Sequence, residues 1–158
     1  DRDTTGIIIF VKNYFVHTLY DYLIRNNKIK RYYLALVSNK LPQNQGVIEK
    51  KIGKNRHSNQ KMIVSKTGVY AKTAYKIIKQ YRNYSLIELE LYTGRTHQIR
   101  VHMNAINCPI LGDKLYGNLS PLIDRQALHA YKVVIPHPIT LEPLTFIAEV
   151  PNDMKKLI

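Results

Sequence analysis

Cysteine, tryptophan and long apolar runs are scarce or missing in this sequence of 158 residues. Its one cysteine, Cys108, has no partner for an internal disulfide, which predicts a reducing compartment. The longest apolar runs, such as residues 7–11, are far shorter than the roughly 20 residues that a membrane-spanning helix needs. The first residues also lack the pattern of a signal peptide. We therefore expect a cytoplasmic protein without a transmembrane segment.

Acidic residues are also few, since 11 Asp and Glu stand against 24 Lys and Arg and give a net charge of +13. An excess of this size favours a polyanionic partner, with nucleic acid ahead of an anionic membrane. Between Lys50 and Arg82, called the basic segment below, ten basic residues occur without one acid. An exposed face normally mixes both signs, whereas a segment that follows phosphates has no use for carboxylates. We expect the basic segment to form one side of a nucleic-acid groove.

Hydrophobic residues make up 45% of the chain, which is enough for the core of one domain. The apolar run at residues 7–11 is typical of a buried strand, and Asn13 is expected to cap a helix that the asparagines at 26–27 end. Thr96 is expected to cap a helix that runs to about Ile106. Further strands are expected at residues 32–37, 46–53, 62–64, 73–79 and 85–92, and side chains should alternate strictly between two faces in the last of these. A hairpin is expected around Pro136, Pro138 and Pro143. Because most connections are too short for parallel crossovers, the predicted class is α+β, with a mixed, mostly antiparallel sheet and a few flanking helices.

The densest group of polar residues lies at residues 93–102, where a predicted strand meets a predicted helix. Gly94 permits a sharp turn, and the free N–H groups of the helix start create a place where anions bind. Arg95, His97 and Arg100 add side-chain donors there. A metal site fits less well, since His97 and His102 are five positions apart and no carboxylate or thiolate completes a ligand set. Neither of the glycine-rich phosphate-loop motifs occurs.

Residues 91–103, LYTGRTHQIRVHM, followed by residues 109–113 and 116–117, resemble the signature of the RluA-type pseudouridine synthases. Residues 1–8, DRDTTGII, are similar to the family's catalytic motif H-R-L-D-x-x-T-S-G, with Asp1 at the position of the aspartate. Residues 31–37, RYYLALV, resemble its K-x-Y-x-A-x-V motif, with Tyr33 at the active-site tyrosine. Residues 128–130 and 137–138 match its closing L-H-A and H-P pattern. The resemblance implies one pseudouridine synthase domain over residues 1–158, which we expect to be shortened at its N-terminus because the family has H-R-L and further chain before the aspartate.

The resemblance also implies a reaction that turns a uridine of RNA into pseudouridine without a cofactor. The N1–C1′ bond breaks and the base is rejoined through C5, after the target base has been flipped out of its helix. Asp1 would attack C1′ or C6, or abstract a proton from the ribose, and the sequence does not decide among these. Arg100 would keep Asp1 ionised, and Tyr33 would stack on the uracil and could remove the C5 proton. The expected RNA contacts are Arg95, His97 and Gln98 at the pocket and Arg56 and Lys61 on the basic segment.

Ribosomal RNA is the expected substrate ahead of transfer RNA, and we expect a monomer that needs no metal, no cofactor, no membrane and no obligate protein partner. Two other classes of protein stay open. An RNA-binding module of the same fold would have lost catalysis, and Asp1 is the residue that distinguishes it from an enzyme. A basic protein that binds DNA or anionic membranes nonspecifically would need no combination of Asp1, Tyr33 and residues 95–100, which argues against that class.

Overall fold

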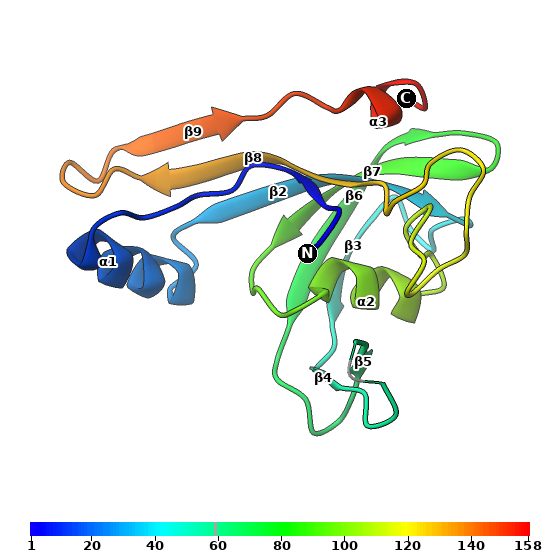
Figure 1. Ribbon diagram of the computed structural model, residues 1–158, viewed down its shortest axis with the longest axis horizontal. Helices are drawn as coiled ribbons and strands as arrows, with labels where there is room; N and C mark the ends of the chain where they lie inside the picture. Colours follow the sequence, from blue (N-terminus) through cyan, green and yellow to red (C-terminus); the bar gives the residue numbers. More distant parts are fainter. Residues whose placement is uncertain (59) are drawn as a thin grey trace.

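A seven-stranded sheet organises the computed structural model, which describes residues 1–58 and 60–158 (Figure 1). Its strands follow the order β1-β8-β2-β7-β6-β3, and β9 pairs with β8. Only β1 and β8 run parallel among the paired strands, which confirms the predicted α+β class with a mostly antiparallel sheet. The strands are β1 (Thr5–Gly6), β2 (Lys30–Ser38), β3 (Gln45–Glu49), β6 (Lys72–Gln80), β7 (Tyr84–Leu91), β8 (Leu128–Pro136) and β9 (Pro143–Ile147).

The strand expected at residues 46–53 is in fact two strands that belong to different sheets. After β3 the chain leaves the large sheet, and β4 (Ile52–Lys54) pairs with β5 (Met62–Val64) in a separate antiparallel hairpin. Figure 1 shows this β4–β5 hairpin below the large sheet, next to helix α2. A small core of Ile52, Ala71 and Val101 fixes its base. The two lysines at residues 50–51 mark the break, and the alternation of apolar residues across it gave no sign of a change of sheet.

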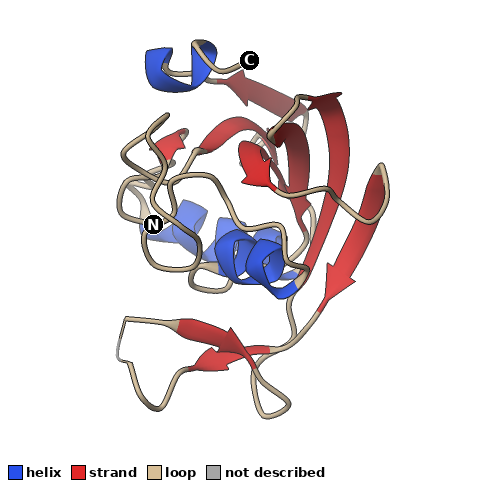
Figure 2. Ribbon diagram, turned by 90° about the vertical axis from the view of Figure 1, so that its right-hand side faces the viewer, coloured by secondary structure: helices blue, strands red, loops and turns tan. Residues whose placement is uncertain are grey.

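The helices are α1 (Tyr14–Arg25), α2 (Gln98–Ala105) and the short α3 (Asn152–Lys155), and Figures 1 and 2 place α1 and α2 on the same side of the curved sheet. The predicted cap of α1 is confirmed, because Asn13 Oδ1 accepts hydrogen bonds from the N–H groups of Phe15 and Val16. The predicted cap of α2 is wrong. His97, not Thr96, occupies that position, and its side chain makes no capping bond. Among the described residues, no helix is long and apolar enough to cross a membrane.

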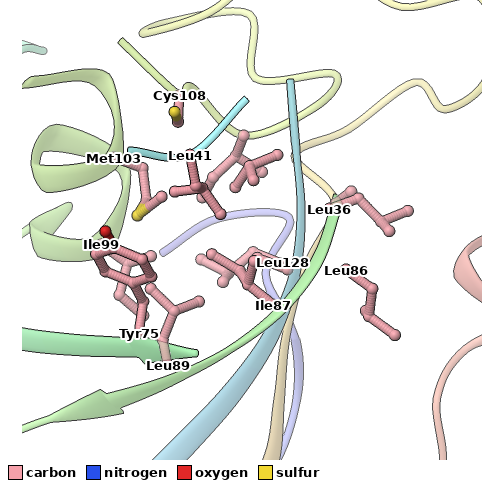
Figure 3. Packing of buried hydrophobic residues seen from close by; sticks show 14 of the residues in the cluster. Leu36, Leu41, Tyr75, Leu86, Ile87, Leu89, Ile99, Met103, Cys108 and Leu128 are labelled. Atoms are coloured by element: carbon pink, nitrogen blue, oxygen red, sulfur yellow. The ribbon is translucent and has the colours of Figure 1, made fainter. Parts of the chain in front are cut away.

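Much of the main core lies between the sheet and α2, while Leu36 and Leu86 lie on the other face of the sheet (Figure 3). The alternation predicted for the strand at 85–92 is confirmed, since Ile87 and Leu89 are fully buried while Glu88 and Glu90 are partly exposed. Met103 on α2 packs into the same cluster and is also fully buried. This packing holds α2 against the sheet, and with it the loop that precedes α2.

The expectation of a buried strand at residues 7–11 is wrong. Strand β1 ends at Gly6, and the exposed fractions of Ile8 and Phe10 are 72% and 83%. The physical reason lies in β8, since β2 occupies one of its edges and β9 occupies the other from Lys132 onward. The last ladder bond of the first segment runs from the Ile7 N–H to the Ala130 carbonyl oxygen, and the chain then turns away. Composition alone could not show that this edge was already taken.

Candidate active site

Residues from three distant parts of the sequence line one cavity of about 530 Å³. Asp1 precedes β1, Tyr33 lies on β2, and Arg95, His97 and Gln98 come from the loop before α2 and its first turn. The structure thus brings together five of the eight residues that the sequence indicated for the site. Arg100 lies directly behind them on α2, whereas Arg56 and Lys61 are not among the residues of this cavity.

The chain before β1 is fixed by residues that precede β8. The Gln126 side chain donates hydrogen bonds to the carbonyl oxygen of Arg2 at 2.6 Å and to the hydroxyl of Thr4 at 3.2 Å. The hydroxyl of Thr5 contacts His129 Nδ1 at 2.9 Å. These bonds place Asp1 at the cavity even though β1 contains only two residues.

Two basic side chains approach the carboxylate of Asp1. Arg100 Nη1 lies 3.7 Å from Asp1 Oδ2, and His97 Nε2 lies 4.0 Å from Asp1 Oδ1. The Asp1 side chain is only 20% exposed, so water screens these interactions weakly. The structure therefore contains the ion pair between Asp1 and Arg100 that the resemblance implied.

The stronger partner of Arg100, however, is Asp113, which was not among the predicted site residues. Arg100 Nε and Nη2 each donate to one Asp113 carboxylate oxygen at 2.7 Å, and Asp113 is fully buried. Burial alone would raise the pKa of Asp113, but Arg100 and the N–H groups of Leu115 and Tyr116 shift it below its usual value. Asp113 thus holds the guanidinium rigidly in front of Asp1. The sequence did contain a sign of this role, because Asp113 belongs to a segment that resembles the family signature and had no part in the proposed reaction.

His97 is oriented by a hydroxyl that contacts the β4–β5 hairpin. The Met62 N–H donates to Tyr116 Oη at 2.7 Å, so the hydroxyl proton is available to His97 Nδ1, which lies 2.8 Å away. The other ring nitrogen, Nε2, faces Asp1. Burial lowers the pKa of His97, Arg100 lowers it further and Asp113 opposes this shift, so the neutral ring is favoured at pH 7. Its backbone has a φ of 56°, in the left-handed region, a strain typical of functional sites.

Gln98 is buried, and its amide is fully engaged within the protein. Its oxygen accepts from the Thr93 hydroxyl and the Arg95 N–H, and its nitrogen donates to the Lys72 carbonyl and the Thr73 hydroxyl. These four bonds use every donor and acceptor of the side chain. They fit a role in holding the loop and leave no polar atom for RNA.

The remaining expected RNA contacts differ in position. Arg95 is exposed at the cavity, and its Nε donates to the Tyr70 carbonyl oxygen, which leaves its terminal nitrogens for a ligand. Arg56 and Lys61 lie between β4 and β5, and Lys61 borders a neighbouring hollow together with Met62 and Tyr116. Neither side chain lines the cavity that contains Asp1.

Tyr33 forms a wall of the cavity with its ring half-buried. Burial raises its pKa, and the nearby Arg31 opposes this shift only in part, so the phenol is protonated at neutral pH. Among the residues described, no group of three or more His, Cys, Asp or Glu side chains is close enough to hold a metal ion.

Comparison with known proteins agrees with this geometry. The model of the RNA pseudouridylate synthase family matches residues 1–105. The chain is 43% identical over 159 residues to the uncharacterized RNA pseudouridine synthase YhcT of Bacillus subtilis, covering 99% of this chain and 53% of the relative. It is 37% identical over 171 residues to the ribosomal large subunit pseudouridine synthase D of Vibrio cholerae, covering 99% and 52%. The chain thus spans about half the length of these relatives.

A solved structure shares the fold. The human RNA pseudouridylate synthase domain containing 1 superposes with a TM-score of 0.73 at 24% identity, over 87% of this chain and 61% of that protein. At this level of identity the likeness concerns the fold alone. The family model covers two thirds of the chain, including Asp1, Tyr33 and the loop before α2, and the curated relatives extend the match to its end. The chain therefore belongs to the RNA pseudouridylate synthases, in their RluA-type branch.

Proposed function

We propose that the protein converts uridines of RNA into pseudouridine, with ribosomal RNA ahead of transfer RNA as the substrate. The observation that carries this proposal is the convergence of Asp1, Tyr33 and the loop before α2 on one cavity, with Arg100 3.7 Å from Asp1. The relatives named ribosomal large subunit pseudouridine synthase D support the choice of RNA.

The reaction exchanges one bond of the uracil for another. The N1–C1′ bond breaks, the base turns in the cavity, a bond forms between C5 and C1′, and the proton lost from C5 is balanced by one gained at N1. No electron is gained or lost overall, so the step needs no redox partner. Asp1 is the nucleophile at C1′ or C6, or the base that takes a ribose proton, and each route starts from an ionised carboxylate.

The surroundings of Asp1 serve this starting state. Arg100, held by Asp113, supplies a fixed positive charge, and Nε2 of His97 faces the other carboxylate oxygen. Both groups are in position before the substrate enters, which lowers the cost of reorganisation during the reaction.

Tyr33 provides a ring face for a uracil that has been flipped out of its helix. Its raised pKa favours this stacking role over the role of a base, because a protonated phenol cannot accept the C5 proton. Arg95 at the cavity and the cations of the basic segment would bind the phosphates on either side.

The test is to incubate the intact protein with total RNA from cells that lack it, and to map pseudouridine at nucleotide resolution. We expect new pseudouridine at one or a few defined sites, predominantly in ribosomal RNA. RNA that binds tightly but remains unmodified would identify an RNA-binding module instead of an enzyme.

A further inference from the structure

Arg31 is a half-buried cation without an ion-pair partner among the described residues. It lies on β2 two residues before Tyr33, so both side chains point to the same face of the strand. Its Nε is buried without a hydrogen-bond partner, and no carboxylate of the described residues lies within ion-pair distance of its guanidinium. A guanidinium that is largely removed from water is normally paired, because an uncompensated charge there is costly.

The environment of Arg31 confirms how unusual this position is. Burial lowers its pKa, and the titratable group that counteracts this is the phenol of Tyr33, which is neutral. An arginine nevertheless stays charged in proteins. A charged group that is half-buried, with a buried Nε and no ion-pair partner among the described residues, is most simply explained by an anion that arrives with a ligand.

The guanidinium points toward the Asp1 cavity, where it is one of the lining groups together with Tyr33, Gly94 and Arg95. A Cβ at position 94 would lie only 2.7 Å from Arg31 Nη1, so the absence of a side chain at Gly94 gives the guanidinium its room. Arg31 and Arg95 thus border the same opening on either side of Gly94, while the Asp1 carboxylate faces Arg100 and His97.

We propose that Arg31 binds a phosphate group of the RNA, namely a phosphate that flanks the flipped uridine. This inference rests on the proposed function. A phosphate is a permanent anion whose oxygens match the fork of a guanidinium, whereas a uracil ring is neutral until the reaction starts. The site therefore anchors the target nucleotide by its backbone, next to the ring that stacks on its base.

The test compares the binding of uridine 3′,5′-bisphosphate, uridine and uracil to the intact protein by NMR titration. We expect the bisphosphate to bind at least tenfold more tightly than uridine to the wild type. Arg31→Gln should reduce this ratio to about threefold or less and leave the affinity for uracil unchanged. Lys30→Gln, which removes an exposed cation from the opposite face of the same strand, is the matched control and should keep the wild-type ratio.

Two further variants separate the loss of binding from a loss of structure. Arg31→Lys keeps the charge and should retain an intermediate ratio. Gly94→Ala keeps Arg31 itself but pushes its guanidinium aside, and should lower the ratio as Arg31→Gln does. Unfolding temperatures of all variants identify any that fail to fold, and only folded variants are compared.

The inference is overturned if the wild type binds the bisphosphate no better than uridine, or if folded Arg31→Gln and Gly94→Ala both keep the wild-type ratio. A selective loss of uracil binding in Arg31→Gln would also overturn it, because Arg31 would then contact the base. The proposed function fails by a different result, namely the absence of pseudouridine after incubation of the wild type with RNA. The two failures are therefore distinguishable.

Discussion

Asp1 is the residue on which the proposed chemistry depends. Asp1→Asn keeps the shape of the side chain but removes its charge and nearly all of its nucleophilicity. We expect pseudouridine formation to fall by at least 1,000-fold, about 4 kcal/mol in the activation free energy. RNA affinity should change less than threefold, because binding rests on many phosphate contacts elsewhere. The measurements are single-turnover rates and filter binding on the same RNA.

Asp3→Asn is the control for this change, since it removes a carboxylate two positions along the chain that forms no ion pair among the described residues. Its rate should stay within a factor of three of the wild type. A rate near the wild-type value in Asp1→Asn would remove Asp1 from the mechanism.

The ion pair of Arg100 and Asp113 leads to a prediction about the stability of the fold. Asp113→Ala leaves a buried guanidinium with only the more distant Asp1 as a partner, and should lower the free energy of unfolding by about 3–5 kcal/mol. Arg125 and Asp153 form a pair of the same bidentate geometry, but the Asp153 side chain is 42% exposed. Asp153→Ala should therefore cost about 1 kcal/mol or less. Urea unfolding measures both, and equal losses would contradict the argument from burial.

Among the helices and strands, features that depend on neighbouring residues were predicted correctly, whereas features that depend on distant parts of the chain were not. Asn13 and the alternation of residues 85–92 act within one element, and both predictions are confirmed. The prediction of a buried strand at residues 7–11 was wrong because β9, which is far away in the sequence, occupies the edge of β8. The prediction that Thr96 caps α2 was wrong because the side chain of Gln98 accepts a hydrogen bond from the Arg95 N–H and so shapes the turn before α2.

The candidate site divides in the same way. Asp1, Tyr33 and the loop before α2 were found through motifs, and the structure brings them to one cavity. Asp113 and Arg31 were not predicted as site residues. Asp113 matters because it pairs with Arg100, and Arg31 matters because its Nε has no hydrogen-bond partner. Contacts between residues that are far apart in the chain cannot be predicted from the spacing of residues or from composition.

The β4–β5 hairpin carries a prediction about RNA affinity. If about four to six cations of the basic segment contact phosphates, the log–log slope of affinity against salt is roughly −3 to −5, at about 0.7 per contact for single strands. Changing Arg56 and Lys61 together to alanine should flatten that slope by about one unit or a little more. The sequence preference of modification should remain, because phosphate contacts position RNA without reading it.

Arg25→Ala with Lys28→Ala, on α1 and just after it, is the charge-matched control and should leave the slope as in the wild type. Binding isotherms between 50 and 300 mM salt suffice for the comparison. An unchanged slope in the hairpin variant would show that Arg56 and Lys61 face solvent in the complex.

For the whole molecule, buried histidines predict how stability depends on pH. Burial lowers the pKa values of His97, His102 and His129. As the pH falls below about 6.5, the unfolded chain therefore binds protons that the folded chain does not, and the free energy of unfolding decreases. Urea unfolding at pH 7.5, 6.5 and 5.5 should show this loss, in a range above that in which aspartates titrate.

His102→Asn should flatten this dependence, since His102 is fully buried between Thr73 and the carbonyl of Lys50. His17→Gln, on the exposed side of α1, is the control. Stability that increased between pH 7.5 and 5.5 would be the opposite of the expected sign.

The pairing of β1 with β8 also sets the order of events during translation. Thr5 contacts His129, 124 positions along the chain, and Gln126 holds the segment around Arg2. A nascent chain on the ribosome can form the β6–β7 hairpin early, but its first residues have no docking partner until β8 has emerged. Asp1 is thus synthesised well before β8 and reaches its place only after β8 is available. Catalytic competence should appear as one of the final steps of folding, after most of the sheet has formed.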